Sequence, residues 1–415
     1  MMPKLRLERS PSAALPLRFL FAMPCWGMAG GLALLIDGDT PLHSRWHPAT
    51  LALVHMWTLG VLGNAMFGSL LQFLPAAAGA ELRWRRSAPW LHATFNLGVL
   101  VLVAGLHGNA RGPLFVAGVL LPAAFLWLAA MTLPGMFAAA GEGLLRAGVG
   151  AALGYGVATA LAGGGLALLL AGRRPWPLAA VDVHAAFGVL GWMVLLLAAV
   201  GRLTMPMFQA TGGVPARAQA VWLGSVALAL PLAAAWHLAH GADVVLPSVA
   251  ATSAAAFVLA ALWLQWPVPV ARRHALYRHW RMGLLALLLA ALALLAGHGL
   301  LAGALALGVG LPLLVGGMAM EIVPFVAWID LRHRVPRGVQ IPGVQRLLPD
   351  AARQRALLAQ AVAAPSLVLA VLWPQPWLAR LAGLAQLGAW AVHGHALSSA
   401  LRNAHGFARR VEKPV

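Results

Sequence analysis

The sequence predicts an all-α, polytopic membrane protein with about 12 transmembrane helices. Of its 415 residues, 61% are hydrophobic and only 10% are charged, whereas about one quarter of a soluble domain is charged. The mean hydropathy is +0.81. Long apolar runs recur along the chain, without the ten-residue alternation of a membrane β-barrel. Because backbone in lipid must satisfy its own hydrogen bonds, these runs are predicted to be helices.

Twelve segments are apolar over the roughly 20 residues that a helix needs to cross a bilayer. In chain order, we expect them at 16–36, 51–75, 89–107, 112–133, 145–171, 181–208, 218–239, 244–266, 280–297, 300–329, 355–373 and 378–401. The first segment lacks a clear small-residue cleavage site, so we expect a helix there and not a signal peptide. The connecting loops are short, which indicates a single transmembrane domain over residues 1–415.

The net charge of +18 does not indicate a nucleic-acid-binding protein, because the basic residues lie in loops between apolar spans. With both termini in the cytoplasm, 22 of the 29 Lys and Arg residues fall in inside segments and 5 in outside segments. This asymmetry favours a multi-pass protein of the bacterial inner membrane with both termini cytoplasmic. The expected partner is therefore the lipid bilayer. The single cysteine, Cys25, excludes an internal disulfide and a cysteine-based metal cluster.

A three-fold internal repeat organises the chain. Its copies are 55–75, 184–206 and 300–324, each an apolar span that ends in a proline. The prolines recur after four spans each time, which predicts pseudo-three-fold repeats of four helices around one axis. The first two copies carry a histidine, His55 and His184, and the third carries none. Alternatively, Gly-rich membrane helices resemble one another because small residues permit close packing.

Twelve helices with repeats centred on helices 2, 6 and 10 resemble subunit I of the heme-copper oxidases. His55 matches the place where that family holds its low-spin heme. The chain is also similar to the NnrS family, which is associated with heme, copper and nitric-oxide metabolism. The resemblance to helices 6 and 10 is carried by His184-x-x-x-Gly188-x-x-Gly191, Gly201-Arg202, Pro206-Met207-Phe208 and Glu321-Ile322-Val323-Pro324-Phe325. It implies heme or copper as cofactor, and respiratory-chain or denitrification proteins as partners.

The chain departs from the oxidase pattern at the ligands of the oxygen-reducing site. Helix 10 of oxidases carries His-x-His, but segment 300–329 contains no histidine. Neither tyrosine, Tyr155 or Tyr277, lies in the sixth span, and the adjacent histidine pair that binds copper in oxidases is missing. The NnrS-type His-x-His-Glu motif is not matched around His55 either. A complete binuclear oxygen-reducing site is therefore not expected.

His55 and His184 are the strongest candidate cofactor ligands. Ionisable groups inside a membrane are costly and usually functional, and neutral imidazole binds heme iron, copper and zinc. Both histidines are expected near the outer ends of repeat-related helices that face one axis. The alternative is that each is an interfacial histidine bonded to a carbonyl or to water.

Further histidines form weaker candidate sites. His237 and His240, spaced i, i+3 and close to Asp243, could bind an exposed metal, although helix-end polar residues are more common. His393 and His395 imitate the oxidase His-x-His in the last span, and one of them could face His92 to form a second heme or metal level. His43, His47 and His298 add to a histidine-rich outer surface, which could receive copper or be solvated at the interface.

Gln72, Arg202 and Glu321 are expected in a polar layer toward the inner side. An unpaired buried charge is expensive, so Arg202 and Glu321 are predicted to pair across spans 6 and 10. The basic loop 331–355 is expected to lie on anionic lipid.

Three function hypotheses follow. The first is a heme- or copper-binding protein with histidine ligands. The second is a transporter for a metal or small solute, with the polar layer lining its pathway. The third is an assembly partner of a respiratory complex.

Overall fold

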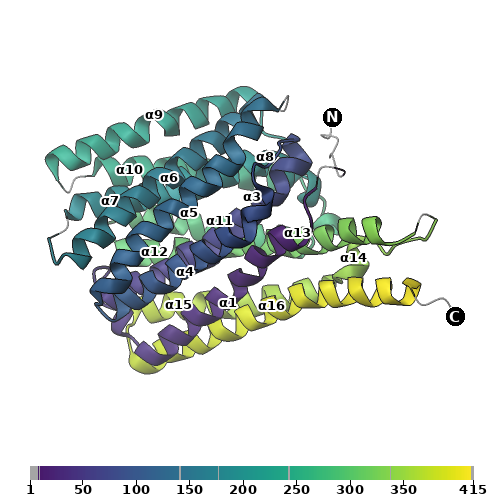
Figure 1. The fold of residues 1–415 in the computed structure, drawn as a ribbon. Coiled ribbons are helices and arrows are strands. Elements are labelled where there is room, and N and C mark those ends of the chain that lie inside the picture. The colour runs from purple at the N-terminus through teal and green to yellow at the C-terminus, as the bar shows by residue number, and fades with distance from the viewer. Residues whose placement is uncertain are drawn as a thin grey trace.

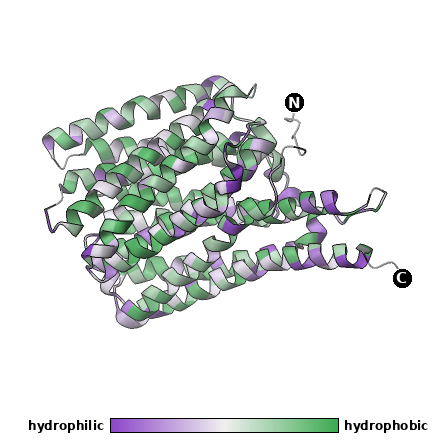
Figure 2. Cartoon of the chain, in the orientation of Figure 1, coloured by the Kyte–Doolittle hydropathy of each residue, from purple (hydrophilic) through white to green (hydrophobic). Residues whose placement is uncertain are grey.

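The computed structural model describes residues 8, 10–139, 142–175, 177–241, 244–336 and 338–412, and every regular element in these ranges is helical. The elements form one bundle of long helices that lie side by side (Figure 1). The predicted all-α fold is therefore confirmed. Many large apolar side chains point outward from the bundle, among them Leu228 and Leu232 of α9 and Leu285 and Leu289 of α11. Figure 2 shows apolar residues along the length of the helices, as expected for a surface covered by lipid.

Three of the long helices are continuous runs in which an α-helix is interrupted by a π-helical segment. The first run comprises α2 (Pro48–His55), the π-helix η3 (Met56–Gly63), α3 (Asn64–Phe73) and the π-helix η4 (Leu74–Ala78). The second comprises α7 (Leu178–Ala186), the π-helix η6 (Phe187–Val194) and α8 (Leu195–Gln209). The third comprises α12 (Gly299–Gly303), the π-helix η8 (Ala304–Gly310) and α13 (Leu311–Arg334).

The other elements are mostly uninterrupted helices. They are α1 (Ala14–Asp37), α4 (Ala88–His107), α5 (Arg111–Ala138), α6 (Gly143–Ala171), α9 (Ala216–His240), α10 (Val245–Gln265), α11 (Ala275–Leu295), α14 (Val344–Leu347), α15 (Asp350–Leu372) and α16 (Pro376–Glu412), with short 3₁₀ turns at Thr40–Leu42, Arg85–Ser87 and Val270–Arg272. By length and composition, eleven helical runs in the described ranges could cross a membrane, and they coincide with the first eleven predicted spans. The twelfth predicted span lies in α16, which is not among those eleven and carries polar residues such as Gln386 and His393.

The first and last helices pack closely in antiparallel directions. Along their contact, Gly27 meets Trp390, Gly31 meets Leu387 and Gly383 meets Leu35, so the numbers rise in α1 as they fall in α16. The start of α1 and the end of α16 consequently lie at the same end of the bundle (Figure 1). We call this the terminal end and the opposite one the distal end.

The three repeat helices share their irregularity. The π-helices η3 and η6 begin 19 residues before Pro75 and Pro206, and η8 begins 20 residues before Pro324. Each repeat run packs along the long helix that precedes it in the chain, namely α1, α6 and α11. The repeat inferred from the sequence is therefore also a repeat of local backbone structure.

Candidate cofactor site

His55 is the last residue of α2 and stands directly before the π-helix η3. Its ring Nδ1 lies 2.7 Å from the Leu51 carbonyl oxygen, one turn earlier in the same helix. A carbonyl accepts a hydrogen bond only from a protonated nitrogen, so this contact places the ring proton on Nδ1. Nε2 is then left with a free lone pair, the form of histidine that binds metals.

His184 is held in the same way by a different helix. It lies near the end of α7, and its Nδ1 is 3.0 Å from the carbonyl oxygen of Thr159 in α6. Gly163, one turn further along α6, makes room for the ring, because a Cβ there would lie 2.7 Å from His184 Cε1. Ligating histidines in metalloproteins typically donate their second ring N–H to a carbonyl or carboxylate, as both of these rings do.

The structure brings the two predicted ligands together. The ring centroids of His55 and His184 are 6.3 Å apart, and the ring planes are inclined by 24°. The two rings therefore lie at one site, and His55 and His184 are the residues that would hold a shared metal ion there.

Both histidines line a cavity of about 300 Å³ between the three repeat runs. The third run, which has no histidine, contributes small residues to this cavity, including Gly299, Gly303 and Ala304. A Cβ at Gly303 would meet no atom within 4 Å. The third repeat thus adds no histidine to the cavity, and its backbone at Gly303 leaves room for a side chain.

A charged cluster forms the distal rim of this cavity. Arg45 Nη1 lies 2.8 Å from Asp182 Oδ1, and both residues line the cavity. The buried His237 of α9 approaches the other carboxylate oxygen of Asp182, at 3.5 Å from its Nε2. Arg45 also lies over the ring of Trp46, 4.1 Å from its centroid. These contacts tie three segments together at the mouth of the cavity.

The candidate metal pair on α9 is not assembled. His237 is buried and contacts Asp182, whereas His240 is exposed and stacks on Trp236 with ring centroids 3.9 Å apart. Asp243 lies outside the described residues. At the distal surface, His43 pairs with Asp39, and the His47 ring accepts a hydrogen bond from the backbone of Ala49 at the start of α2.

The second level of ligands predicted from His92, His393 and His395 is not assembled either. His393 is buried next to Trp390 and Gly316, and His395 is exposed, as expected for residues i and i+2 of one helix. His92 packs edge-on against Phe19, at a centroid distance of 4.8 Å. His393 instead lies close to His279 of α11, which flanks the neighbouring Gly317. No motif marked His279 in the sequence.

The predicted ion pair between Arg202 and Glu321 is wrong, because each residue has another partner. Arg202 binds Glu142, 2.5 Å from Nε to Oε1, together with the Val214 carbonyl and the Gln219 side chain. Glu321 binds Arg353, 3.0 Å from Oε1 to Nε and 3.2 Å from Oε2 to Nη2. Gln72 lies apart from both ion pairs and lines a second cavity. The three residues therefore do not form one polar layer.

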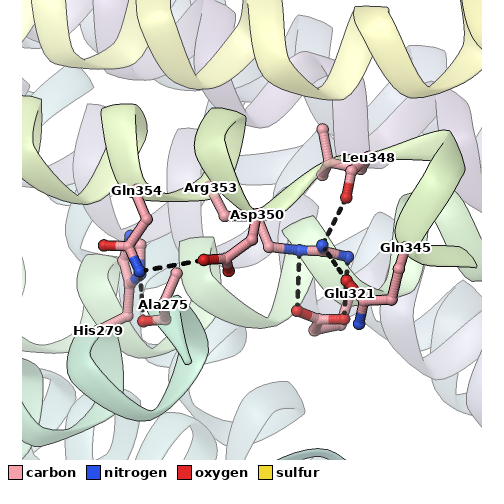
Figure 3. A network of polar contacts seen from close by, with 8 residues as sticks. All are labelled: Ala275, His279, Glu321, Gln345, Leu348, Asp350, Arg353 and Gln354. Atoms are coloured by element: carbon pink, nitrogen blue, oxygen red, sulfur yellow. Dashed lines mark hydrogen bonds and ion pairs between the residues drawn. The ribbon is translucent and has the colours of Figure 1, made fainter. Parts of the chain in front are cut away.

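Arg353 is buried, with a side chain only 2% exposed, although it belongs to the loop expected to lie on lipid. Figure 3 shows its guanidinium between Glu321 of α13 and two residues of the connecting segment, Gln345 of α14 and Leu348 directly after it. Nη1 donates to the Leu348 carbonyl at 2.5 Å and to Gln345 Oε1 at 2.7 Å. This part of the loop is therefore fastened to the helix bundle through Arg353.

Among the described residues, no group of three or more His, Cys, Asp or Glu side chains could hold a metal ion. A metal bound by His55 and His184 would thus take only two ligands from these residue types. Comparison with protein-family models and with curated proteins finds no match to this chain.

Proposed function

We propose that the protein is a heme- or copper-binding integral membrane protein linked to respiration or nitric-oxide metabolism. The observation that carries this proposal is the His55–His184 pair. Two imidazoles face each other across one cavity, each with Nδ1 bonded to a carbonyl, at a separation of 6.3 Å. Bound heme iron or copper would supply a one-electron redox centre at this position.

The fit differs between the two cofactors. His55 and His184 would be the residues that hold either cofactor, because neutral imidazole binds both heme iron and copper. The cavity of about 300 Å³ is at the lower end of the range of about 300–1,000 Å³ for small-molecule pockets, so it accommodates a metal ion more readily than a macrocycle. Copper(I) also suits the apolar lining, because a single positive charge costs less to bury than a double one.

A complete oxygen-reducing site is not part of the proposal. The third repeat run lines the cavity only with glycine, alanine and leucine, and Tyr155 packs against Phe187 and Gly191. The site is therefore proposed to bind its cofactor for electron transfer, or to bind a small ligand such as nitric oxide at that cofactor.

The transporter hypothesis has less support. Neither Arg202 nor Glu321 lines either of the two central cavities, and each is held in an ion pair. A pathway lined by these charges would require both pairs to open. The third hypothesis, an assembly partner with degenerate ligands, predicts the same fold without a bound cofactor.

Absorption spectroscopy and metal analysis of the purified protein test the proposal. Cells should be supplied with 5-aminolevulinate and copper, so that neither cofactor is limiting. We expect either a Soret band or about one copper per chain, following the single histidine pair. His55→Ala and His184→Ala should each reduce the bound cofactor at least tenfold.

His43→Ala is the matched control, because His43 is an exposed distal histidine outside the cavity. It should leave the cofactor content unchanged. A colourless, metal-free wild-type protein would contradict the proposal and favour the assembly hypothesis. Equal cofactor loss in all three variants would show that the histidine pair is not the binding site.

A further inference from the structure

The outward face of α11 is basic near its start and apolar over the rest of its length. Exposed leucines recur at helical spacing, from Leu285 through Leu289 to Leu292. The half-buried Arg281 lies one turn before Leu285 on the same face, and the exposed Arg278 lies one turn before Arg281. This face of α11 therefore places two guanidinium groups at the end of an apolar stripe.

The neighbouring helix α15 has the same pattern. Leu358 and Val362 are exposed on it, and the exposed Arg355 lies close before them. The first turns of the two helices are joined, because Arg278 Nη1 donates to Gln354 Oε1 at 3.4 Å. Figure 3 shows Gln354 of α15 beside the start of α11. The three arginines therefore gather at one end of two adjacent apolar stripes.

The three arginines contact uncharged groups. Besides the bond between Arg278 and Gln354, Arg281 Nη1 donates to the Tyr277 hydroxyl at 2.9 Å, and Arg355 Nε donates to the Ala351 carbonyl at 3.3 Å. A guanidinium has five N–H donors, so each of these side chains keeps donors for a further partner.

Other arginines of the bundle have a carboxylate as partner. Arg202 binds Glu142, Arg334 binds Asp330 and Arg353 binds Glu321, each at 3.0 Å or less. Within the ranges that the structure describes, no carboxylate oxygen lies within 4 Å of the three arginines on α11 and α15. The positive charge at this place is therefore not neutralised by those parts of the chain.

The position of the arginines along the helices fits the headgroup level of a membrane. α15 begins at the terminal end, where Asn403 of α16 donates to the carbonyl of Leu347, three residues before α15. From Arg281 to Leu292 the chain rises about 16 Å along the helix. One leaflet of a hydrocarbon core that is about 30 Å thick has about this depth. Acyl chains of the leaflet at the terminal end thus have the length of these stripes.

The geometry points to a binding site for one anionic phospholipid at the terminal end of α11 and α15. Arg278, Arg281 and Arg355 bind the phosphate, and the two acyl chains lie along the apolar stripes of the two helices. Arginine suits this role because its planar fork binds two phosphate oxygens at once. The surplus positive charge favours a headgroup with net negative charge over one that also carries an ammonium group. This inference is independent of the metal proposed at His55 and His184.

The test is binding of dioleoyl phosphatidylglycerol to the purified full-length protein, measured by native mass spectrometry from a neutral detergent. We expect the wild type to retain one such lipid at concentrations at which dioleoyl phosphatidylcholine is not retained. In Arg278→Gln with Arg281→Gln, the dissociation constant for phosphatidylglycerol should rise roughly tenfold or more. Arg355→Gln, which changes only the neighbouring helix, should also raise it.

Arg409→Gln with Arg410→Gln is the matched control. It removes the same charge from the last turn of α16, where both arginines are exposed, and should leave the dissociation constant unchanged. Equal weakening in the two double variants would overturn the inference, because only the total charge would then matter. Equal retention of the two lipids would overturn it as well. Glycerol 3-phosphate should not displace the lipid, and displacement would show a site for free phosphate and not for a phospholipid.

Discussion

At the residue scale, the two proposed ligands are fixed by backbone carbonyls and not by acidic side chains. Leu51 and Thr159 each accept the Nδ1 proton of one ring, which sets both tautomers without introducing a second charge into an apolar site. Asp182 lies two residues from His184, but its carboxylate is engaged by Arg45 and His237. The protein thus separates the charged rim from the neutral imidazoles.

A first prediction concerns the buried ion pair at the terminal end. Arg353→Met should destabilise the protein by about 3–5 kcal/mol, because it leaves the Glu321 carboxylate buried without its cation. Replacing both partners, in Arg353→Met with Glu321→Leu, should restore most of the lost stability. The thermal unfolding midpoint in detergent measures both effects.

The control for this prediction is an exposed ion pair in the same region. Arg334 and Asp330 are paired at 2.9 Å, but the arginine side chain is 54% exposed. Arg334→Met should therefore cost no more than about 1 kcal/mol. If Arg353→Met and Arg334→Met lowered the midpoint equally, the buried pair would not have the structural importance assigned to it.

The histidine pair could be predicted from the sequence, whereas the ion pairs could not. His55 and His184 stand at similar places in two repeats, so the symmetry of the repeats brings them to one axis. No such rule links Arg353 to Glu321, because the arginine lies in the first turn of α15, outside the repeat helices, and its position beside α13 depends on tertiary packing. Glu142, the partner of Arg202, likewise lies in a loop that carries no repeat signal.

At the scale of elements, the π-helices set the geometry of the central axis. Each one shifts the register of the helix after it, and such segments often occur at functional sites. Asn64, the first residue after η3, donates to the Gly60 carbonyl at 2.8 Å and exchanges hydrogen bonds with Asn96 of α4. The Asn64 side chain thus donates to a π-helix carbonyl that a backbone N–H would satisfy in a regular α-helix. Hydropathy predicts where a helix is but not how it is wound, so these segments were not foreseen.

A second prediction tests the close packing of α1 and α16. Gly383→Ala should weaken it, because the new methyl group would lie 2.6 Å from the backbone nitrogen of Leu35 and would force the helices apart. Gly388→Ala, in the same helix, meets no atom within 4 Å and should be neutral or stabilising by up to about 1 kcal/mol.

The unfolding midpoints of the two alanine variants provide the comparison. Gly383→Ala should melt below the wild type, and Gly388→Ala at or above it. Similar midpoints for both would show that α1 and α16 can separate without cost, in conflict with the antiparallel contact that the structure shows.

At the scale of the whole molecule, the fold has two chemically different ends. The distal end carries the rim of the histidine cavity, with Arg45 and Asp182. The terminal end carries the exposed basic residues Arg85, Arg86 and Arg346, together with the last turns of α13 and α16. An excess of Lys and Arg marks cytoplasmic segments, so we predict that the terminal end faces the cytoplasm and that the histidine cavity lies in the outer half of the membrane.

A third prediction follows from this orientation and uses the fact that the chain has a single cysteine. In a Cys25→Ser background, His43→Cys and Arg174→Cys introduce exposed thiols at the distal end, and Arg85→Cys and Arg346→Cys introduce them at the terminal end. A membrane-impermeant maleimide applied to intact cells, with the outer membrane permeabilised where there is one, should label only the distal pair. All four should be labelled after lysis.

The reverse labelling pattern would place the cavity in the cytoplasmic half, where its cofactor would be loaded from inside the cell. Labelling of both ends in intact cells would contradict a bundle that spans the membrane with its termini on one side.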